Sequence, residues 1–305
     1  MDPSASAKAN MSTVAESLAQ HTISPSKIQI SQLKHRLDIL ACWFGALESA
    51  QSALSGKIVV EIGCGQGDMT VALAHAVSSC SSDSQTEAVR VGRVVGLDPA
   101  PLTYGAPFTL GQAQSHIRAS SLGRYVDWEQ VDPLEYLSAI VGSADEADYI
   151  VLAHSLFYLP SEAYLADLMR RFAVNASRKG AKRTRLLVAE WGMKAVVPAQ
   201  EAHVLAVKAQ QLAPIEDGNV RLVLDPKDVT ALCYKAGWRV SKEQWIECPR
   251  LDDGLWEVDA AGTLKKEPGS NVARVIDRME AARSRAGKVD SMSVWTAVFE
   301  LEEHH

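Results

Sequence analysis

Three glycines and an acidic residue stand together at the end of a short run of β-branched residues. In "KIVVEIGCGQGDMT", residues 57–70, Glu61 precedes Gly63 by two positions, and Gly65 and Gly67 follow at alternate positions. Glycine adopts backbone torsions that other residues avoid, and without a side chain it lets the main chain approach a ligand closely. The stretch therefore predicts a tight turn at which a ligand binds.

The spacing of these glycines excludes two common phosphate-binding turns. A dinucleotide-binding G-x-G-x-x-G turn that begins at Gly63 would need a glycine where Asp68 stands. A P-loop would need a Gly-Lys-Ser or Gly-Lys-Thr sequence, and the segment contains neither. The remaining pattern is E-x-G-x-G-x-G, and a turn with a purely structural role stays open as an alternative.

The elements around the turn alternate between strand and helix patterns. Short apolar runs predict strands within residues 57–63, 92–99, 125–133, 147–155, 183–191 and 291–302. Helical patterns occupy residues 68–77 and begin again near 161, and a helix, a turn and a strand are predicted within 225–248. This alternation predicts a doubly wound, mostly parallel α/β sheet, in which ligands bind beyond the carboxyl ends of the strands.

With its glycine turn at the end of the first strand, the sequence resembles the class I S-adenosylmethionine-dependent methyltransferases. The resemblance covers residues 56–190 well and the closing strands more loosely. It implies a Rossmann-like sheet of seven strands and S-adenosylmethionine as the cofactor. It also implies that the turn of Gly63, Cys64, Gly65 and Gly67 approaches the methionine part, while Glu61 orients the turn or meets the amino group through water.

Two acidic residues further along match the next positions of that family. Asp98 ends the second predicted strand, where the family uses a carboxylate for both ribose hydroxyls, and two oxygens suit two hydroxyl donors. A plain turn before Pro99 is the alternative reading. After the third strand, the resemblance places Asp132 near the adenine amino group with Val131 against the ring, and Asp127 is the rival candidate.

The segment after the fourth strand, "AHSLFYLP" at residues 153–160, resembles that of family members that act on small molecules. It lacks the Asn/Asp-Pro-Pro-aromatic turn of enzymes that methylate nucleobases or glutamine. It also lacks the aspartate ligand of metal-dependent catechol methyltransferases. The sequence therefore predicts methyl transfer to an oxygen or nitrogen of a small secondary metabolite, by in-line displacement without a metal ion.

Five residues are candidates for the acceptor side of this site. His154 is a candidate general base because an imidazole titrates near neutral pH, and a bond to backbone or cofactor is the alternative. Tyr158 and Tyr104 are the other catalytic candidates, although Tyr158 as a core aromatic would be equally ordinary. His35 and His203 lie in segments that cover the site in this family, and each reads as a surface or packing histidine.

The chain divides into a disordered tail at residues 1–12, a helical cap at 13–55 and a cofactor-binding catalytic domain at 56–305. The cap is predicted from apolar residues at helical spacing within 31–54. Insertions at about 191–225 and 250–290 are expected to form a lid over the acceptor site, the second of them from a polar loop and an amphipathic helix. A serine-rich stretch at 78–91 is predicted to be a surface loop.

Composition limits the partners of the protein. The formal net charge of −6 gives no general attraction to nucleic acid or anionic membranes, and the basic stretch at 178–185 is short enough to be a solvated connector. Five scattered cysteines without a C-x-x-C pair fit a reducing compartment. We expect a soluble, cytoplasmic protein whose partner is a small-molecule acceptor; the sequence does not indicate an oligomeric state.

Two other functions share this fold and this cofactor motif. An isomerase or cyclase could use bound S-adenosylmethionine for its positive charge and transfer no methyl group. A regulatory or binding protein could retain the scaffold without catalysis. The intact Glu61, glycine turn and Asp98 favour an enzyme over the regulatory protein, and no part of the cofactor motif separates the transferase from the isomerase.

Overall fold

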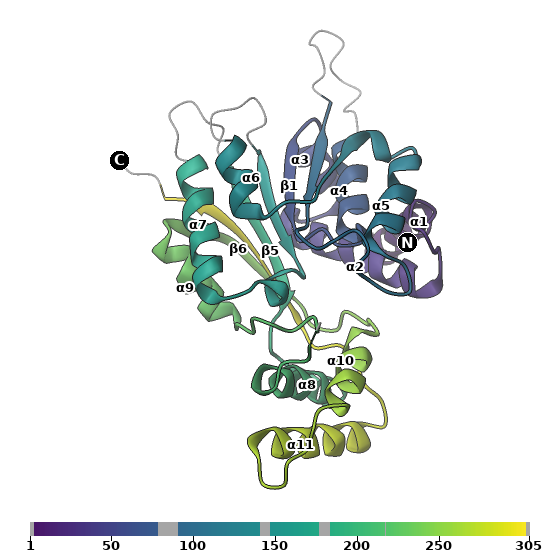
Figure 1. Cartoon of the computed structure of the whole chain (residues 1–305). Helices are drawn as coiled ribbons and strands as arrows, with labels where there is room; N and C mark the ends of the chain where they lie inside the picture. Colours follow the sequence, from purple (N-terminus) through teal and green to yellow (C-terminus); the bar gives the residue numbers. More distant parts are fainter. Residues whose placement is uncertain (1–2, 79–90, 141–146, 177–183, 217, 303–305) are drawn as a thin grey trace.

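The protein is built on a seven-stranded sheet with helices on both faces, as the computed structural model shows (Figure 1). The structure describes residues 3–78, 91–140, 147–176, 184–216 and 218–302. The strands lie in the order β3-β2-β1-β4-β5-β7-β6, and β7 runs in the direction opposite to the other six. Their bounds are β1 Ile58–Ile62, β2 Arg93–Leu97, β3 Val126–Glu129, β4 Tyr149–Ala153, β5 Arg185–Trp191, β6 Trp238–Ile246 and β7 Val294–Leu301. The predicted doubly wound, mostly parallel sheet is confirmed.

Two apolar clusters, one on each face, hold the helices to the sheet. The first cluster contains residues of the five helices α1, α2, α3, α4 and α5, and the second contains residues of α6, α7 and α9. Strands β1 and β4 are buried along their whole length, and their alternate side chains contribute to the two clusters. The helices of the first face are α1 Pro3–Ala19, α2 Lys27–Phe44, α3 Leu47–Leu54, α4 Asp68–Ser78 and α5 Leu110–Ala119. Those of the second are α6 Pro133–Ile140, α7 Glu162–Ala176 and α9 Pro226–Lys235. Short 3-10 turns occur at Gly123–Tyr125, Leu156–Tyr158 and Pro198–Gln200.

The N-terminal segment is more ordered than the sequence predicts. Helix α1 begins at Pro3, within the stretch of residues 1–12 that is predicted to be a disordered tail. The stretch is rich in alanine, a strong helix former, and Met11 and Val14 pack against the same core that buries Ala15 and Leu18. Residues 3–12 are therefore helical in the structure, where the sequence predicts a disordered tail.

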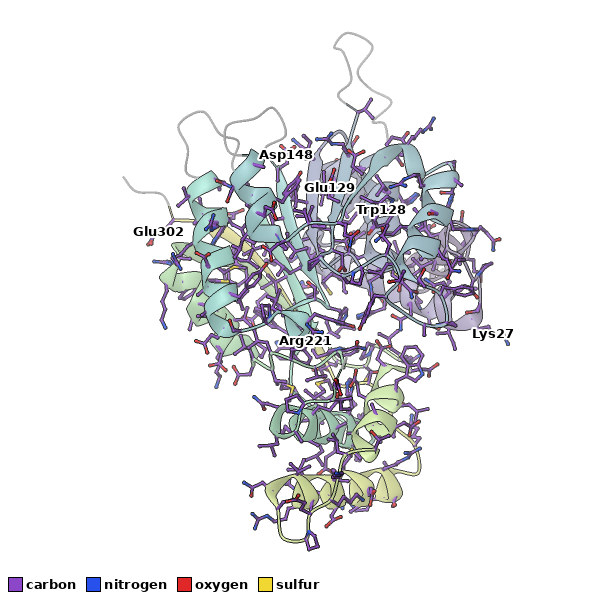
Figure 2. All side chains as sticks on the ribbon, in the orientation of Figure 1. Lys27, Trp128, Glu129, Asp148, Arg221 and Glu302 are labelled. Carbon is purple, nitrogen blue, oxygen red and sulfur yellow. The ribbon has the colours of Figure 1, made fainter. Side chains whose placement is uncertain are left out.

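A separate lobe of three helices stands beyond the carboxyl end of β5 (Figure 1). It consists of α8 Glu201–Leu212, α10 Asp253–Gly262 and α11 Asn271–Ala286, which share an apolar cluster of their own. The backbone N–H of Arg221, which Figure 2 shows between the sheet and this lobe, donates to the Phe157 carbonyl at 2.8 Å. This bond connects the segment between α8 and α9 to the segment that follows β4.

Two further helices, α5 and α10, lie where the sequence predicts no helix. Residues 253–262 form α10 because Val258 and Ala261 are buried in the lobe, where the sequence predicts a polar loop. The loop after β2 ends at Thr109, which caps α5 through a reciprocal bond with Gln112. The predicted surface loop at 78–91 and the basic stretch at 178–185 fall largely outside the described residues. Within the described part, the helices are all too short or too polar to cross a membrane.

We predict that Trp43→Ala lowers the free energy of unfolding by about 3–5 kcal/mol. Trp43 is buried where α2 meets the sheet, and its Nε1 donates to the Val188 carbonyl at 3.0 Å. Chemical denaturation measures the change. Trp256→Ala is the matched control because the Trp256 side chain is 49% exposed, and it is expected to shift stability by within about 0.5 kcal/mol. Equal effects of both changes would contradict the docking of α2 on the core.

Candidate cofactor and acceptor site

The glycine turn joins β1 to α4 and has one open position. Gly63, Gly65 and Gly67 all have positive φ, at 71°, 53° and 97°. A Cβ atom at Gly63 would lie 2.7 Å from the Ser155 Cβ, and one at Gly67 would lie 2.6 Å from the Ile117 Cδ1. At Gly65 no atom lies within 4 Å of that position. Gly63 and Gly67 are therefore required by packing, whereas Gly65 leaves space for a ligand against the main chain.

Asp98 fixes the turn from the end of β2. The Gly65 N–H donates to its Oδ2 at 2.9 Å, and the Ala100 N–H donates to its Oδ1 at 2.9 Å. The Gln114 Nε2 donates to the Gly65 carbonyl at 3.0 Å from α5. Each carboxylate oxygen of Asp98 keeps a free lone pair, so it can still accept a ribose hydroxyl. The side chain of Cys64, the predicted turn residue between Gly63 and Gly65, is buried, so only its backbone is part of the turn surface.

Glu61 lies beneath the turn and is 2% exposed. It accepts a hydrogen bond from the Thr70 hydroxyl at 2.6 Å, which links the end of β1 to α4. Burial raises the pKa of Glu61 to about 8, against the opposing effects of the Thr70 bond and of the Arg36 charge. At neutral pH this carboxyl is therefore largely protonated, and its contact orients the turn.

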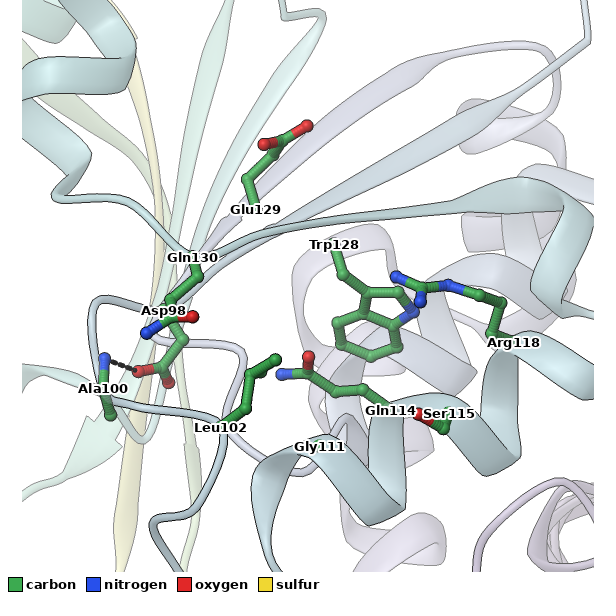
Figure 3. Close-up of a pocket in the computed structure, with 10 residues that line it drawn as sticks. All are labelled: Asp98, Ala100, Leu102, Gly111, Gln114, Ser115, Arg118, Trp128, Glu129 and Gln130. Carbon is green, nitrogen blue, oxygen red and sulfur yellow. Dashed lines mark hydrogen bonds between the residues drawn. The ribbon is translucent and has the colours of Figure 1, made fainter.

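A small pocket, open to solvent, adjoins Asp98 at the ends of β2 and β3 (Figure 3). Trp128 and Gln114 form its wall, and the buried Trp128 Nε1 has no hydrogen-bond partner. Figure 3 shows Gln130 beside Asp98 and Glu129 directed away from the other labelled side chains. The full lining is Asp98, Ala100, Leu102, Gly111, Gln114, Ser115, Arg118, Trp128, Glu129 and Gln130. Its position next to Asp98 suits the nucleoside end of a ligand.

The residues predicted to contact adenine do not line this pocket. Val131 packs against the second apolar cluster. The Asp132 carboxylate accepts from the Leu134 N–H at 2.8 Å and from the Tyr164 hydroxyl at 2.9 Å, so it caps the start of α6. The rival candidate Asp127 pairs with Arg93 at 3.3 Å. An adenine contact by Asp132 or Val131 therefore stays a prediction.

His154 lies directly after β4 and contacts two other titratable residues. Its backbone has φ 54°, an uncommon value for a residue with a Cβ, and its N–H donates to the Ala189 carbonyl at 2.8 Å. Its Nε2 lies 2.8 Å from the His35 Nε2, and its Nδ1 lies 3.5 Å from the Glu190 Oε1. The structure thus brings together helix α2 and the ends of β4 and β5.

Burial controls the charge of these three groups. It lowers the pKa of His154 well below its usual value, and the Arg36 charge adds to the effect. The pKa of His35 is lowered in the same way by burial, by His154 and by Arg36. Burial raises the pKa of Glu190 to about 7 although its carboxylate accepts from the Trp191 and Leu156 N–H groups. Both imidazoles are therefore neutral at pH 7.

His203 continues this cluster from α8. It is fully buried, its Nδ1 accepts from the Met292 N–H at 2.9 Å, and its Nε2 therefore carries the proton and has no partner. Its ring packs edge-on against Trp191 at 4.9 Å, and Trp191 lies 4.6 Å from the His154 ring. Burial lowers the pKa of His203 to about 3. His203 is a packing residue at the edge of the site, and neither it nor His35 is on the surface.

The two candidate tyrosines lie at the outer side of this cluster. Tyr158 is 47% exposed and Tyr104 is 36% exposed. The Tyr104 hydroxyl donates weakly to the Asn219 Oδ1 at 3.4 Å. Tyr158 is therefore not a core aromatic. Contact with an acceptor remains a prediction for both residues.

Most of the buried polar atoms that lack a hydrogen-bond partner gather in this region. Buried polar groups are nearly always paired, so such a group marks a place that a ligand or water completes. On α2, at the end of β4 and on α8, the described atoms are Gln32 Oε1, His35 Nδ1, Arg36 Nη1, His154 Nδ1, Ser155 Oγ and His203 Nε2. They face the ends of the strands next to the glycine turn, which is where a cofactor and an acceptor would meet.

Three residues of this region were missed by the sequence reasoning. Glu190 stands at the carboxyl end of a parallel strand, a position that could have identified it because ligands bind at that edge. Arg36 follows His35 on the predicted cap, and nothing in its local pattern marks it. Trp128 lies near the end of the half-exposed strand β3, and its place in the pocket depends on α5, for which the sequence predicts no helix.

Comparison with known proteins gives relatives along most of the chain. Methyltransferase phomM from Diaporthe leptostromiformis is 27% identical over 298 residues, which cover 79% of this chain and 73% of that protein. Methyltransferase phomM' from the same organism is 27% identical over 294 residues, with the same coverage. A crystal structure of a cyclopropane-fatty-acyl-phospholipid synthase-like protein from Lactobacillus casei aligns with a TM-score of 0.73, at 27% identity over 95% of this chain and 99% of that chain. No family model matches.

Fold, turn and relatives agree on the class of protein. The chain is a class I S-adenosylmethionine-dependent methyltransferase, and S-adenosylmethionine is its cofactor. The open face of Gly65 and the free lone pairs of Asp98 fit that cofactor. The comparisons give no support to the isomerase or to the regulatory alternative. Within the described residues, no three His, Cys, Asp or Glu side chains are grouped as a metal site.

We predict that alanine substitutions at Gly65 and Gly67 affect different properties, cofactor affinity at Gly65 and stability at Gly67. Gly65→Ala places a methyl group in the space left for the cofactor, so affinity for S-adenosylhomocysteine falls about tenfold or more while stability falls by only about 1 kcal/mol. Gly67→Ala meets Ile117 and Trp128 and lowers stability by about 1–3 kcal/mol. Calorimetric titration and thermal unfolding measure the two properties. Unchanged affinity in Gly65→Ala would contradict the placement of the ligand.

We predict that Glu61→Gln makes the protein relatively more stable as pH rises. The folded state binds the Glu61 proton up to about pH 8, whereas an unfolded chain releases it near pH 4.5. The wild type therefore loses stability from this group between about pH 4.5 and 8, by at most about 1.4 kcal/mol per pH unit. The difference in unfolding free energy between the two proteins, measured from pH 5 to 8, is expected to shift in favour of the variant. A constant difference would contradict the raised pKa.

Proposed function

We propose that the protein transfers the methyl group of S-adenosylmethionine to an oxygen or nitrogen of a small-molecule acceptor. The observation that carries this proposal is the group of His35, His154 and Glu190 at the ends of β4 and β5. It stands beside the glycine turn, and its polar atoms are buried and partly unpartnered. A hydroxyl or ammonium acceptor must lose a proton, and this group is suited to accept one.

The bound cofactor supplies a methyl group on a positively charged sulfur, which is displaced in line by the acceptor lone pair. The protein must therefore hold the acceptor opposite the sulfur and keep water away. The described residues around His154 are largely buried, and Gln32 of α2 donates to the Asp253 Oδ2 of α10 at 2.7 Å. This bond connects the N-terminal cap to the helical lobe across the site, which supports a lid function for both.

The acceptor proton is assigned to the His154 ring. At neutral pH the ring is uncharged because burial lowers its pKa, so one nitrogen lone pair is available. In the proposed tautomer the His154 Nε2 carries the proton and donates it to the His35 Nε2 at 2.8 Å, so the lone pair is on Nδ1, which has no hydrogen-bond partner and takes the acceptor proton. This nitrogen lies 3.5 Å from the Glu190 Oε1. The Glu190 carboxyl is held by two backbone N–H groups, and when ionised it offsets the charge that forms on the imidazole.

The acceptor is proposed to be a secondary metabolite, and no nucleic acid or membrane partner is proposed. Tyr158 and Tyr104, which are partly exposed, are proposed to lie at the entrance of the acceptor site. A cytoplasmic location is supported by the free state of the described cysteines, which are Cys42, Cys64, Cys233 and Cys248. The names of the two Diaporthe relatives give the reaction class and leave the acceptor open.

The proposal is tested by incubating the protein with S-adenosylmethionine and a panel of small amines, phenols and alcohols. Mass spectrometry is expected to find a product heavier by one CH₂ together with S-adenosylhomocysteine. An isomerised product of unchanged mass would contradict methyl transfer. The same assay with a metal chelator is expected to give the same turnover, because the proposed displacement needs no metal ion.

With an acceptor from this panel, we predict that His154→Gln lowers kcat by about 10² to 10⁴. Cofactor affinity is expected to change little because the proposed role is proton transfer. His116→Gln is the matched control, since His116 is an exposed histidine on α5. Undiminished turnover in His154→Gln would remove His154 as the base.

A further inference from the structure

One face of helix α2 contacts the site through three side chains, each about one helical turn after the one before. The Gln29 Nε2 donates to the Asp68 Oδ1 at 2.7 Å, at the start of α4 directly after the glycine turn. Gln32 contacts Asp253 of α10, and His35 contacts His154 after β4. Residues spaced three apart share a helix face, so α2 lies along the carboxyl edge of the sheet. The next residue on this helix is Arg36.

Arg36 has a buried donor without an acceptor. Its Nη1 is inaccessible and has no hydrogen-bond partner, and within the described residues the structure gives it no ion pair. A guanidinium has five N–H donors and no acceptor, so a buried unpaired N–H is costly unless an anion or another acceptor joins it. The structure around Arg36 is therefore incomplete without such a group.

The neighbouring carboxyl groups do not fill this place. Arg36 stands one turn after Gln32, which contacts Asp253 of α10, and directly after His35, which contacts His154 at the end of β4. In keeping with this position, its charge acts to lower the pKa of Glu61, Glu190 and Asp253. Each of these carboxyls is held by another donor, Glu61 by Thr70, Glu190 by two backbone N–H groups and Asp253 by Gln32. Within the described residues none of the three forms a hydrogen bond or ion pair with Arg36. The guanidinium is left to bind an anion that comes from outside the chain.

The position of Arg36 relative to the turn indicates which anion. Asp98 and the pocket at Trp128 lie at the ends of β2 and β3, on one side of β1 in the sheet. Arg36 follows His35, which contacts His154 at the end of β4, and β4 lies on the other side of β1 together with β5 and Glu190. A cofactor whose ribose lies at Asp98 extends its amino-acid part across the open Gly65 toward that second side.

We propose that Arg36 binds the α-carboxylate of the methionine part of the cofactor, so that the N-terminal cap contributes a cofactor-binding residue. The proposal rests on the assignment of S-adenosylmethionine as the cofactor. A planar guanidinium matches a carboxylate with two parallel N–H donors, which is the strongest common hydrogen-bonded ion pair. Cofactor binding then holds α2 in place over the acceptor site.

The test uses two ligands that differ in this carboxylate alone. S-adenosylhomocysteine carries it, and its decarboxylated analogue S-adenosyl-3-thiopropylamine lacks it. Calorimetric titration of the full chain is expected to show that Arg36→Met weakens binding of S-adenosylhomocysteine about 10- to 100-fold, which is the usual range for a lost charge-assisted pair. Binding of the decarboxylated analogue is expected to stay within about twofold of the wild type, and Arg36→Lys to be intermediate.

Two controls keep the interpretation specific. Lys27→Met removes a positive charge from the exposed start of the same helix, which Figure 2 shows at the edge of the molecule, and both affinities are expected to be unchanged. Unaltered affinity of Arg36→Met for S-adenosylhomocysteine would overturn the proposal, as would an equal loss for both ligands. If the wild type bound neither ligand, the cofactor assignment itself would fail, and this outcome is distinct from the other two.

Discussion

The site depends on the hydrogen bond from the Gly65 N–H to Asp98. This bond joins the turn after β1 to the end of β2, and the Thr70–Glu61 bond fixes the same turn to α4. Backbone that must leave room for a ligand cannot be held by its own side chains, so neighbouring elements have to hold it. The sheet order places β2 and β4 on either side of β1, and this order brings Asp98 and His154 to opposite sides of one turn.

The N-terminal helices extend this arrangement from the sheet to the acceptor side. Helix α2 packs against the core through residues such as Leu37 and Trp43, while its other side presents Gln29, Gln32 and His35 to the site. A helix with one apolar and one polar face usually turns the polar face to water. Here part of the polar face is buried over the strand ends, which explains why its partners are parts of the site.

The elements with strong local patterns could be predicted from the sequence, and the contacts between distant segments could not. The glycine turn, the strands and Asp98 depend on local residue types and on one general rule about parallel sheets. The pairing of His35 with His154 joins residues 119 positions apart, and neither has a neighbour in sequence that indicates the other. Asp132 shows the same limit, because its bond to Tyr164 requires the packing of α7 beside α6. The start of α1 was not predicted because residues 1–12 carry few large apolar side chains and so show no helical apolar spacing.

Burial also decides which charges this site can carry. It raises the pKa of Glu61 to about 8 and that of Glu190 to about 7, and it lowers the pKa of His35 and His154. These two carboxyls and two imidazoles are therefore close to neutral at pH 7, and two imidazoles that carried protons would repel a sulfonium. A neutral imidazole has a lone pair and causes no such repulsion. The same burial thus keeps a proton acceptor available and permits a positively charged cofactor to bind beside it.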